Sequence, residues 1–171
     1  VLVESSFPSE AGTMLKNLEN KGNPWGMGAK ARLDWTQGLD FDVPVVGQDV
    51  EDLSEVDYLY WVGCAGALED RAKKTTRAFA ELLHIAGVRF AVLGEAEACS
   101  GDPARRLGNE FVFQMLAQQN VETLQEANVK KIVATCPHCF NTIKNEYPQF
   151  GLTGVQVVHH TQLLDRLVAE G

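Results

Sequence analysis

From Val56 onward, strand-like and helix-like segments alternate along the chain, and this alternation limits the possible folds more than any other feature of the sequence. Short apolar runs rich in β-branched and aromatic residues indicate strands at 57–62, 88–93, 131–135 and 155–158. Apolar residues at helical spacing, with turn and cap residues around them, predict helices at about 66–86, at 102–127, at 140–146 and from Thr161. Strands that alternate with helices favour a parallel sheet with right-handed crossovers. We therefore predict an α/β fold, a parallel sheet of about four strands with helices on both faces.

Residues 1–50 do not follow this alternation. One short polar helix is expected at 9–22, followed by a loop rich in glycine at 22–28. The Val43–Val46 segment contains a proline, which restricts it to the edge of a sheet. We predict an irregular N-terminal arm or linker at 1–50 that packs on another surface, followed by a single domain at 51–171.

Composition and charge exclude several classes of protein. The chain has 171 residues and a net charge of −8, and no cluster of Lys and Arg overrides that charge, so we expect no nucleic-acid partner. The longest apolar runs have the length of strands, so no segment is expected to span a membrane, and no signal peptide is visible. Four cysteines with one CxxC motif fit reduced intracellular thiols better than a disulfide framework, which predicts a cytoplasmic location.

The four cysteines recur with the period of the predicted strands. Cys64, Cys99 and Cys136 each follow a strand-like segment, and 34 and 36 residues separate them, which is one helix plus one strand each time. Cys139 falls on the first turn of the next helix, where the helix dipole lowers the pKa of a thiol. Because ligands bind at the carboxyl ends of parallel strands, we expect all four thiols to meet at one edge of the sheet.

A site made only of thiolates selects zinc, an iron–sulfur cluster or copper(I). Structural zinc sites usually combine two CxxC knuckles, whereas this chain has one CxxC and takes its other cysteines from separate strand ends. That arrangement favours a larger cluster in a cleft. A zinc-stabilised structural or interaction module without redox chemistry is the alternative. A CxxC thiol/disulfide switch would leave Cys64 and Cys99 without a role.

Several neighbours of the cysteines are further candidates. His159 and His160 follow the last predicted strand, so one of them should face the cysteine edge, and His160 is the candidate proton donor to a substrate. His138 is expected to point outward. Arg105 and Arg106 are expected to pair with a negative cluster, a flavin phosphate or a carboxylate. Glycines beside the cysteines are expected to bring backbone amides close to sulfur, at Gly63, Gly66 and Gly101.

The sequence around the cysteines resembles that of the CCG-domain (cysteine-rich domain) iron–sulfur proteins. This family includes heterodisulfide reductase subunits and the iron–sulfur subunit of glycolate oxidase. The family pattern is a cysteine, then Cys-Cys-Gly, then CxxC, and Cys64, Cys99-Ser-Gly101 and Cys136-Pro-His-Cys139 match it, with Ser100 in place of one cysteine. Residues 99–110 and 136–142 look most like the membrane-associated branch, whose members resemble dehydrogenases that take electrons from electron-transfer flavoprotein. The resemblance covers about residues 20–170.

This resemblance implies an iron–sulfur cluster on Cys64, Cys99, Cys136 and Cys139 that passes electrons or handles a thiol or disulfide. The serine at position 100 argues against the five-cysteine, non-cubane cluster of heterodisulfide reductases and leaves a 4Fe–4S cubane or a smaller linear cluster. The implied function is an electron-transfer module of a larger oxidoreductase of the respiratory chain, of the heterodisulfide reductase-like or electron-transfer-flavoprotein:quinone type.

Family members commonly carry two CCG units, often after a ferredoxin-like segment and sometimes after membrane helices. The resemblance therefore implies that this chain is one half of a tandem pair in a longer protein. The implied partners are electron-transfer flavoprotein or another redox subunit, and other iron–sulfur domains of the same polypeptide. Membrane contact would come only through segments outside this chain, and the full-length protein would lie on the cytoplasmic face of the membrane.

Overall fold

The computed structural model describes residues 8–171, so the first seven residues of the predicted arm lie outside the described residues. The strands of this part are β1 (Tyr58–Trp61), β2 (Phe90–Ala91), β3 (Lys131–Ala134) and β4 (Gln156–His159). The α-helices are α1 (Ser9–Lys21), α2 (Gly63–Leu68), α3 (Asp70–Ile85), α4 (Asp102–Arg106), α5 (Glu110–Glu126), α6 (Pro137–Asn145) and α7 (His160–Glu170). Three 3₁₀ turns complete the set, η1 (Ala29–Thr36), η2 (Gly94–Ala96) and η3 (Tyr147–Phe150).

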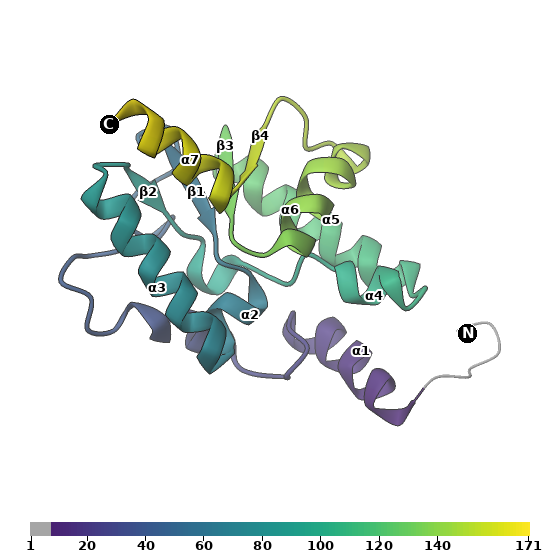
Figure 1. Ribbon diagram of the computed structural model, residues 1–171. Helices are drawn as coiled ribbons and strands as arrows, with labels where there is room; N and C mark the ends of the chain where they lie inside the picture. Colours follow the sequence, from purple (N-terminus) through teal and green to yellow (C-terminus); the bar gives the residue numbers. More distant parts are fainter. Residues whose placement is uncertain (1–7) are drawn as a thin grey trace.

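The four strands form one parallel sheet in the order β2-β1-β3-β4 (Figure 1). Leu59 of β1 is aligned with Ala91 of β2 on one side and with Ile132 of β3 on the other. Val45 forms a parallel bridge with Val92, next to β2. The proline-containing segment at residues 43–46 therefore lies at the edge of the sheet, as predicted. The predicted α/β fold is confirmed.

Side chains that alternate along β1 divide the core into two halves. Leu59 and Trp61 face α5 and α6, whereas Tyr60 and Val62 face α3, α7 and η1. Figure 1 shows α3 and α7 on one side of the sheet and α5 and α6 on the other. Because both faces are covered, the strands are buried except at their ends and carry near-continuous apolar sequences, as is usual in parallel sheets.

Two predicted helices are interrupted in the structure. The helix expected at about 66–86 is divided into α2 and α3, because Glu69 has an extended backbone and its side chain caps α3 by accepting a hydrogen bond from the Ala72 nitrogen. The helix expected at 102–127 is divided into α4 and α5 at Gly108, whose φ is positive, and the Asn109 side chain caps α5. Both breaks lie beside a cysteine segment, so they set the direction in which the chain leaves the sheet edge.

The described part of the N-terminal arm packs on the sheet domain. Helix α1 is confirmed and contacts α5, and its Leu15 and Leu18 belong to the same buried half of the core. Trp35 of η1 is 2% exposed and lies in the other half, whereas Trp25 in the preceding loop is 47% exposed. None of the helices in residues 8–171 is both long and apolar enough to cross a lipid bilayer.

Candidate metal centre at the carboxyl edge of the sheet

The fold brings all four cysteines to the carboxyl ends of three neighbouring strands. Cys64 lies in the first turn of α2 directly after β1, and Cys99 lies in the loop between η2 and α4. Cys136 is the N-cap of α6, and Cys139 lies one turn further along the same helix. All four carry free thiols, and the Cys64 and Cys99 sulfur atoms are 3.8 Å apart. Cys136 and Cys139 lie within one turn at the start of α6, so the thiols form two pairs.

Cys136 has an acidic thiol. A hydrogen bond from the Cys139 side chain, helped by the backbone N–H groups of Cys139 and His138 and by the His138 side chain, lowers the pKa of Cys136 to about 5. Burial acts in the opposite direction. An N-cap thiol next to free helix N–H groups is a thiolate at neutral pH, so Cys136 is ready to bind a soft metal without first losing a proton.

Cys64 and Cys139 hold their protons more tightly than a free thiol. A hydrogen bond to Cys99 and burial raise the pKa of Cys64, and Arg32 lowers it. A hydrogen bond to Cys136 and burial raise the pKa of Cys139, and the Ser100 side chain lowers it through a hydrogen bond of its own. Metal binding to these thiols must therefore release protons.

The two pairs lie close to each other at the same edge of the sheet. Each pair is close enough for the charge of Cys136 to act on Cys64 and for the charge of Cys64 to act on Cys139. Within residues 8–171, no three Cys, His, Asp or Glu side chains gather closely enough to surround one metal ion. The donor set at this edge is therefore four thiols arranged as two pairs.

Gly63 keeps this space free. Its φ is +76°, and a Cβ atom at this position would lie 3.4 Å from the Cys139 sulfur. Gly66 and Gly101 are needed for packing, and the approach of their backbone amides to sulfur stays a prediction. A Cβ at Gly66 would lie 2.8 Å from the Thr76 hydroxyl, and one at Gly101 would lie 2.9 Å from the Phe113 ring, so both allow close packing of helices.

A buried ion pair lies beneath Cys64, and no sequence pattern predicted it. Arg32 and Glu97 are 3% and 4% exposed, and Arg32 Nη1 is 3.2 Å from Glu97 Oε1. Glu97 also accepts hydrogen bonds from the backbone nitrogens of Val62 (3.1 Å) and Gly63 (2.7 Å). Burial raises the pKa of Glu97 to about 7, while Arg32 and the two N–H groups lower it. The two residues are 65 positions apart, so only the fold joins them.

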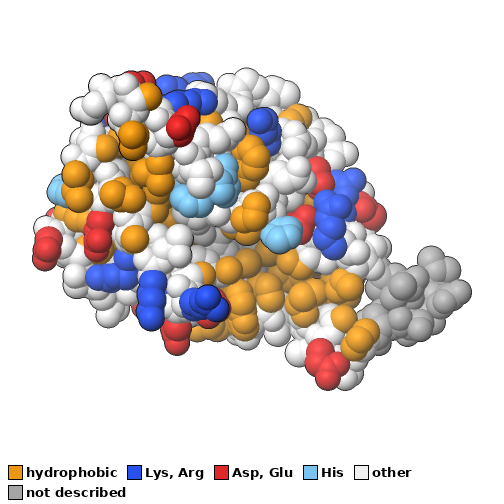
Figure 2. All heavy atoms as spheres, in the orientation of Figure 1, with side chains coloured by type: hydrophobic (Ala, Val, Ile, Leu, Met, Phe, Trp, Pro, Cys, Tyr) orange, Lys and Arg blue, Asp and Glu red, His pale blue; other side chains and the backbone are white. Residues whose placement is uncertain are grey.

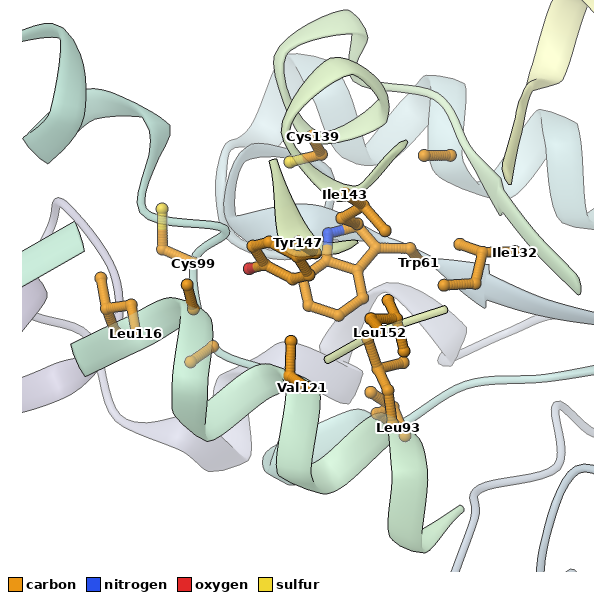
Figure 3. Packing of buried hydrophobic residues seen from close by; sticks show 14 of the residues in the cluster. Trp61, Leu93, Cys99, Leu116, Val121, Ile132, Cys139, Ile143, Tyr147 and Leu152 are labelled. Carbon is orange, nitrogen blue, oxygen red and sulfur yellow. The ribbon is translucent and has the colours of Figure 1, made fainter. Parts of the chain in front are cut away.

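A second buried network holds the Cys99 loop, and its members were also not predicted. The Asn120 side chain donates to the Cys99 carbonyl (2.9 Å) and to the Tyr147 hydroxyl (3.0 Å). The Tyr147 hydroxyl in turn donates to the Ser100 carbonyl at 3.0 Å. Figure 3 shows Tyr147 between Cys99 and Trp61 in the buried cluster. The loop that carries Cys99 and Ser100 is therefore fixed by side chains from α5 and η3.

The remaining predicted residues are two arginines and three histidines near the cysteines. His138 is exposed, as predicted, and Arg105 and Arg106 pair with carboxylates, above all that of Glu146. His159 binds the Thr135 carbonyl oxygen at 3.0 Å. His160 packs edge-on against Phe79 of α3, and burial lowers its pKa. This contact places His160 against the second half of the core, and a role in proton transfer stays a prediction.

The surface near the cysteines is apolar. Figure 2 shows hydrophobic side chains gathered in a hollow where α2, α6 and α1 approach one another. Cys64 and Cys136 are partly exposed, whereas Cys99 and Cys139 are buried. The thiol site is therefore close to the surface, with one member of each pair within reach of solvent or of a partner.

Comparison with known proteins matches a family to the region that contains all four cysteines. Residues 58–144 match the family described as "Cysteine-rich domain", CCG. The chain is 45% identical to a probable iron-sulfur-binding oxidoreductase FadF of Bacillus subtilis and 43% identical to an EtfAB:quinone oxidoreductase of Syntrophomonas wolfei. Each alignment covers 100% of this chain and 24% of the relative. The chain therefore spans about a quarter of the length of these relatives.

A more distant relative shares nearly the whole chain. It is one of the subunits of the dihydromethanophenazine:CoB--CoM heterodisulfide reductase of Methanosarcina barkeri, 31% identical over 96% of this chain and 37% of the relative. No solved structure matches the chain.

Proposed function

The chain belongs to the CCG family of cysteine-rich domains, and we propose that its four cysteines hold an iron–sulfur cluster that transfers electrons within a larger oxidoreductase. The single observation that carries this proposal is the placement of the thiols, which gather as two pairs at the carboxyl edge of the sheet. The names of the relatives support it, because they describe an iron-sulfur-binding oxidoreductase, a quinone oxidoreductase and a heterodisulfide reductase subunit.

The proposed ligands are Cys64, Cys99, Cys136 and Cys139. An iron–sulfur cluster bound there would accept and release single electrons. Cys136 offers the first thiolate, because its pKa is about 5. Cys64 and Cys139 would lose their protons on binding, and the buried Arg32 guanidinium favours the thiolate form of Cys64.

Four thiolates are enough for a 4Fe–4S cubane or for a smaller linear cluster. The fifth position of the family pattern is Ser100, which is buried and whose side chain lowers the pKa of the Cys139 thiol. A hydroxyl gives up its proton far less readily than a thiol, so Ser100 serves as a donor to sulfur rather than as a ligand. The proposed cluster thus has one protein ligand fewer than the five-cysteine type.

The electron partners in this proposal lie outside the described residues. We propose electron-transfer flavoprotein or another redox subunit as one partner, and further iron–sulfur domains of the same polypeptide, including a second CCG unit, as others. The partial coverage of the relatives supports a division of the longer protein in which residues 51–171 form one such unit. Contact with the membrane, on its cytoplasmic face, would come through segments other than these.

The test is to load the protein with iron and sulfide under anaerobic conditions and to measure bound iron, acid-labile sulfide and the visible absorption. The proposal expects iron and sulfide together, with charge-transfer absorption that bleaches on reduction. Replacement of any one of the four cysteines by alanine should lower both contents. The matched control is Val168→Ala, because Val168 is 82% exposed on α7. Full iron and sulfide in Cys64→Ala, or stoichiometric zinc without sulfide in the parent, would contradict the proposal.

A further inference from the structure

Trp61 carries a buried hydrogen-bond donor with no acceptor. The side chain is 0% exposed, and its indole nitrogen Nε1 has no hydrogen-bond partner among the described residues. Buried polar atoms in folded proteins nearly always have a partner, so each exception needs a physical reason. An indole N–H is a donor only, which means that the missing partner must be an acceptor.

The free N–H opens onto the thiol site. The position that a Cβ atom of Gly63 would occupy lies 3.4 Å from the Cys139 sulfur and 3.9 Å from Trp61 Nε1, so both atoms border the same small space. Figure 3 shows the indole nitrogen on the edge of the ring that faces Cys139. Because Gly63 has no side chain, nothing from that residue fills the space between donor and sulfur.

The position of the ring is fixed by the sheet and its packing. Trp61 is the last residue of β1, and the alternation of the strand directs its side chain into the half of the core that contains Cys99 and Cys139. Ile132, Ile143 and Tyr147 belong to the same cluster of buried side chains (Figure 3). The N–H direction is therefore set before any cofactor binds.

We propose that Trp61 donates its indole N–H to a sulfur atom of the iron–sulfur site, either the Cys139 thiolate or a cluster sulfide beside it, and so raises the reduction potential of the cluster. This inference rests on the proposed function. A hydrogen bond to sulfur stabilises the reduced cluster more than the oxidised one, because reduction adds negative charge to the acceptor. Since the indole does not titrate, its contribution is the same over the whole physiological pH range.

The chain offers a matched control in Trp35. This residue is also buried, at 2% exposed, and its Nε1 also has no partner among the described residues. Trp35 lies in the other half of the core, edge-on to Tyr60, and within residues 8–171 that group of buried side chains contains no cysteine. Replacing either tryptophan by phenylalanine thus removes a buried indole N–H that has no partner among the described residues. Of these two residues, only Trp61 is next to a sulfur atom.

The experiment is a redox titration of the anaerobically loaded parent, Trp61→Phe and Trp35→Phe proteins, with iron and sulfide measured on each. For Trp61→Phe, we expect unchanged cluster content and an approximately tenfold lower ratio of reduced to oxidised cluster at a fixed potential, which is a shift of about 59 mV to more negative potential for one electron. For Trp35→Phe, we expect the potential of the parent. An unchanged potential in Trp61→Phe with full cluster content, or an equal shift in Trp35→Phe, would overturn the inference.

A second replacement covers the case in which phenylalanine leaves a cavity that prevents folding. Substituting 3-benzothienylalanine for Trp61 keeps the shape of the ring and replaces N–H by sulfur, so the same shift is expected, and its absence counts against the inference. In the reduced parent, an exchangeable proton coupled to the cluster should be visible by electron-nuclear double resonance and should be missing in both Trp61 variants. Absence of a cluster in the parent itself would instead refute the proposed function, and the inference with it.

Discussion

The Glu97 carboxylate lies 2.7 Å from the backbone nitrogen of Gly63 and accepts its hydrogen bond. Glu97, which lies between β2 and Cys99, thus fixes the backbone at the start of α2. The residue it holds there is Gly63, which directly precedes Cys64. The charge of Glu97 is balanced by Arg32, which comes from η1 in the N-terminal arm. Three segments that are distant in the sequence are joined by one buried carboxylate, directly beneath a proposed cluster ligand.

Glu97→Ala should destabilise the metal-free protein strongly. The substitution leaves Arg32 buried without its counter-charge, and breaking a buried pair from one side costs about 3–5 kcal/mol. The double variant Arg32→Met with Glu97→Ala removes both charges and should lose less stability than the sum of the losses in Arg32→Met and in Glu97→Ala. Equilibrium unfolding in urea measures each value. Asp70→Ala, in the exposed pair with Lys73, is the control and should have a far smaller effect. A strictly additive double variant would mean that the two side chains do not interact.

Gly63→Ala and Gly87→Ala should separate backbone strain from crowding of the site. Both glycines have positive φ, +76° and +68°, so each alanine should cost about 1–2 kcal/mol of stability. A Cβ at Gly87 meets nothing within 4 Å, whereas one at Gly63 would touch the Cys139 sulfur. We therefore expect only Gly63→Ala to lower bound iron or alter the visible spectrum. Equal iron content and spectra in the two variants would show that Gly63 does not border the cluster.

Ser100→Cys should change the cluster, because it places a fifth thiol next to Cys139. The Ser100 side chain is buried and near enough to Cys139 to lower the pKa of that thiol, so the new thiol would offer a further metal ligand there. We expect an altered iron count or an altered paramagnetic signal in the reduced protein. Ser100→Ala is the control, since it removes the hydroxyl without adding a ligand and should keep the iron count. An unchanged signal in Ser100→Cys would show that this residue does not reach the site.

Asp57→Asn should reduce stability at neutral pH and lose its effect in acid. Hydrogen bonds from the Arg89 side chain, and then from its backbone nitrogen, lower the pKa of Asp57 below the ordinary value of 3.8. Because the folded state has the lower pKa, the stabilisation is fully present above the unfolded value and is lost as the pH falls through the folded one. Urea unfolding of parent and variant at pH 7 and pH 3 tests this. A difference that grows in acid would contradict the assigned sign.

The fold and the placement of the cysteines could be predicted because they depend on local patterns. The strand at 57–62 and its following cysteine, for example, are visible as an apolar run with a break after it, and β1 lies at Tyr58–Trp61. Glu97, Arg32 and Asn120 could not be predicted, because their roles come from contacts between distant segments. The breaks at Glu69 and Gly108 were missed for a related reason, since a capping side chain and a positive φ interrupt an apolar pattern that continues on both sides.

The end of α1 contributes to the site more directly than its place in the chain suggests. The Gly22 carbonyl accepts the backbone N–H of Cys99 at 2.7 Å and a hydrogen bond from Arg32 at 3.1 Å. A shortened unit limited to the family match at 58–144 would contain all four thiols but neither of these contacts. Transplanting the site into another scaffold would therefore require residues 22–35 as well, since the sheet edge supplies the sulfur atoms and the arm supplies one wall around them.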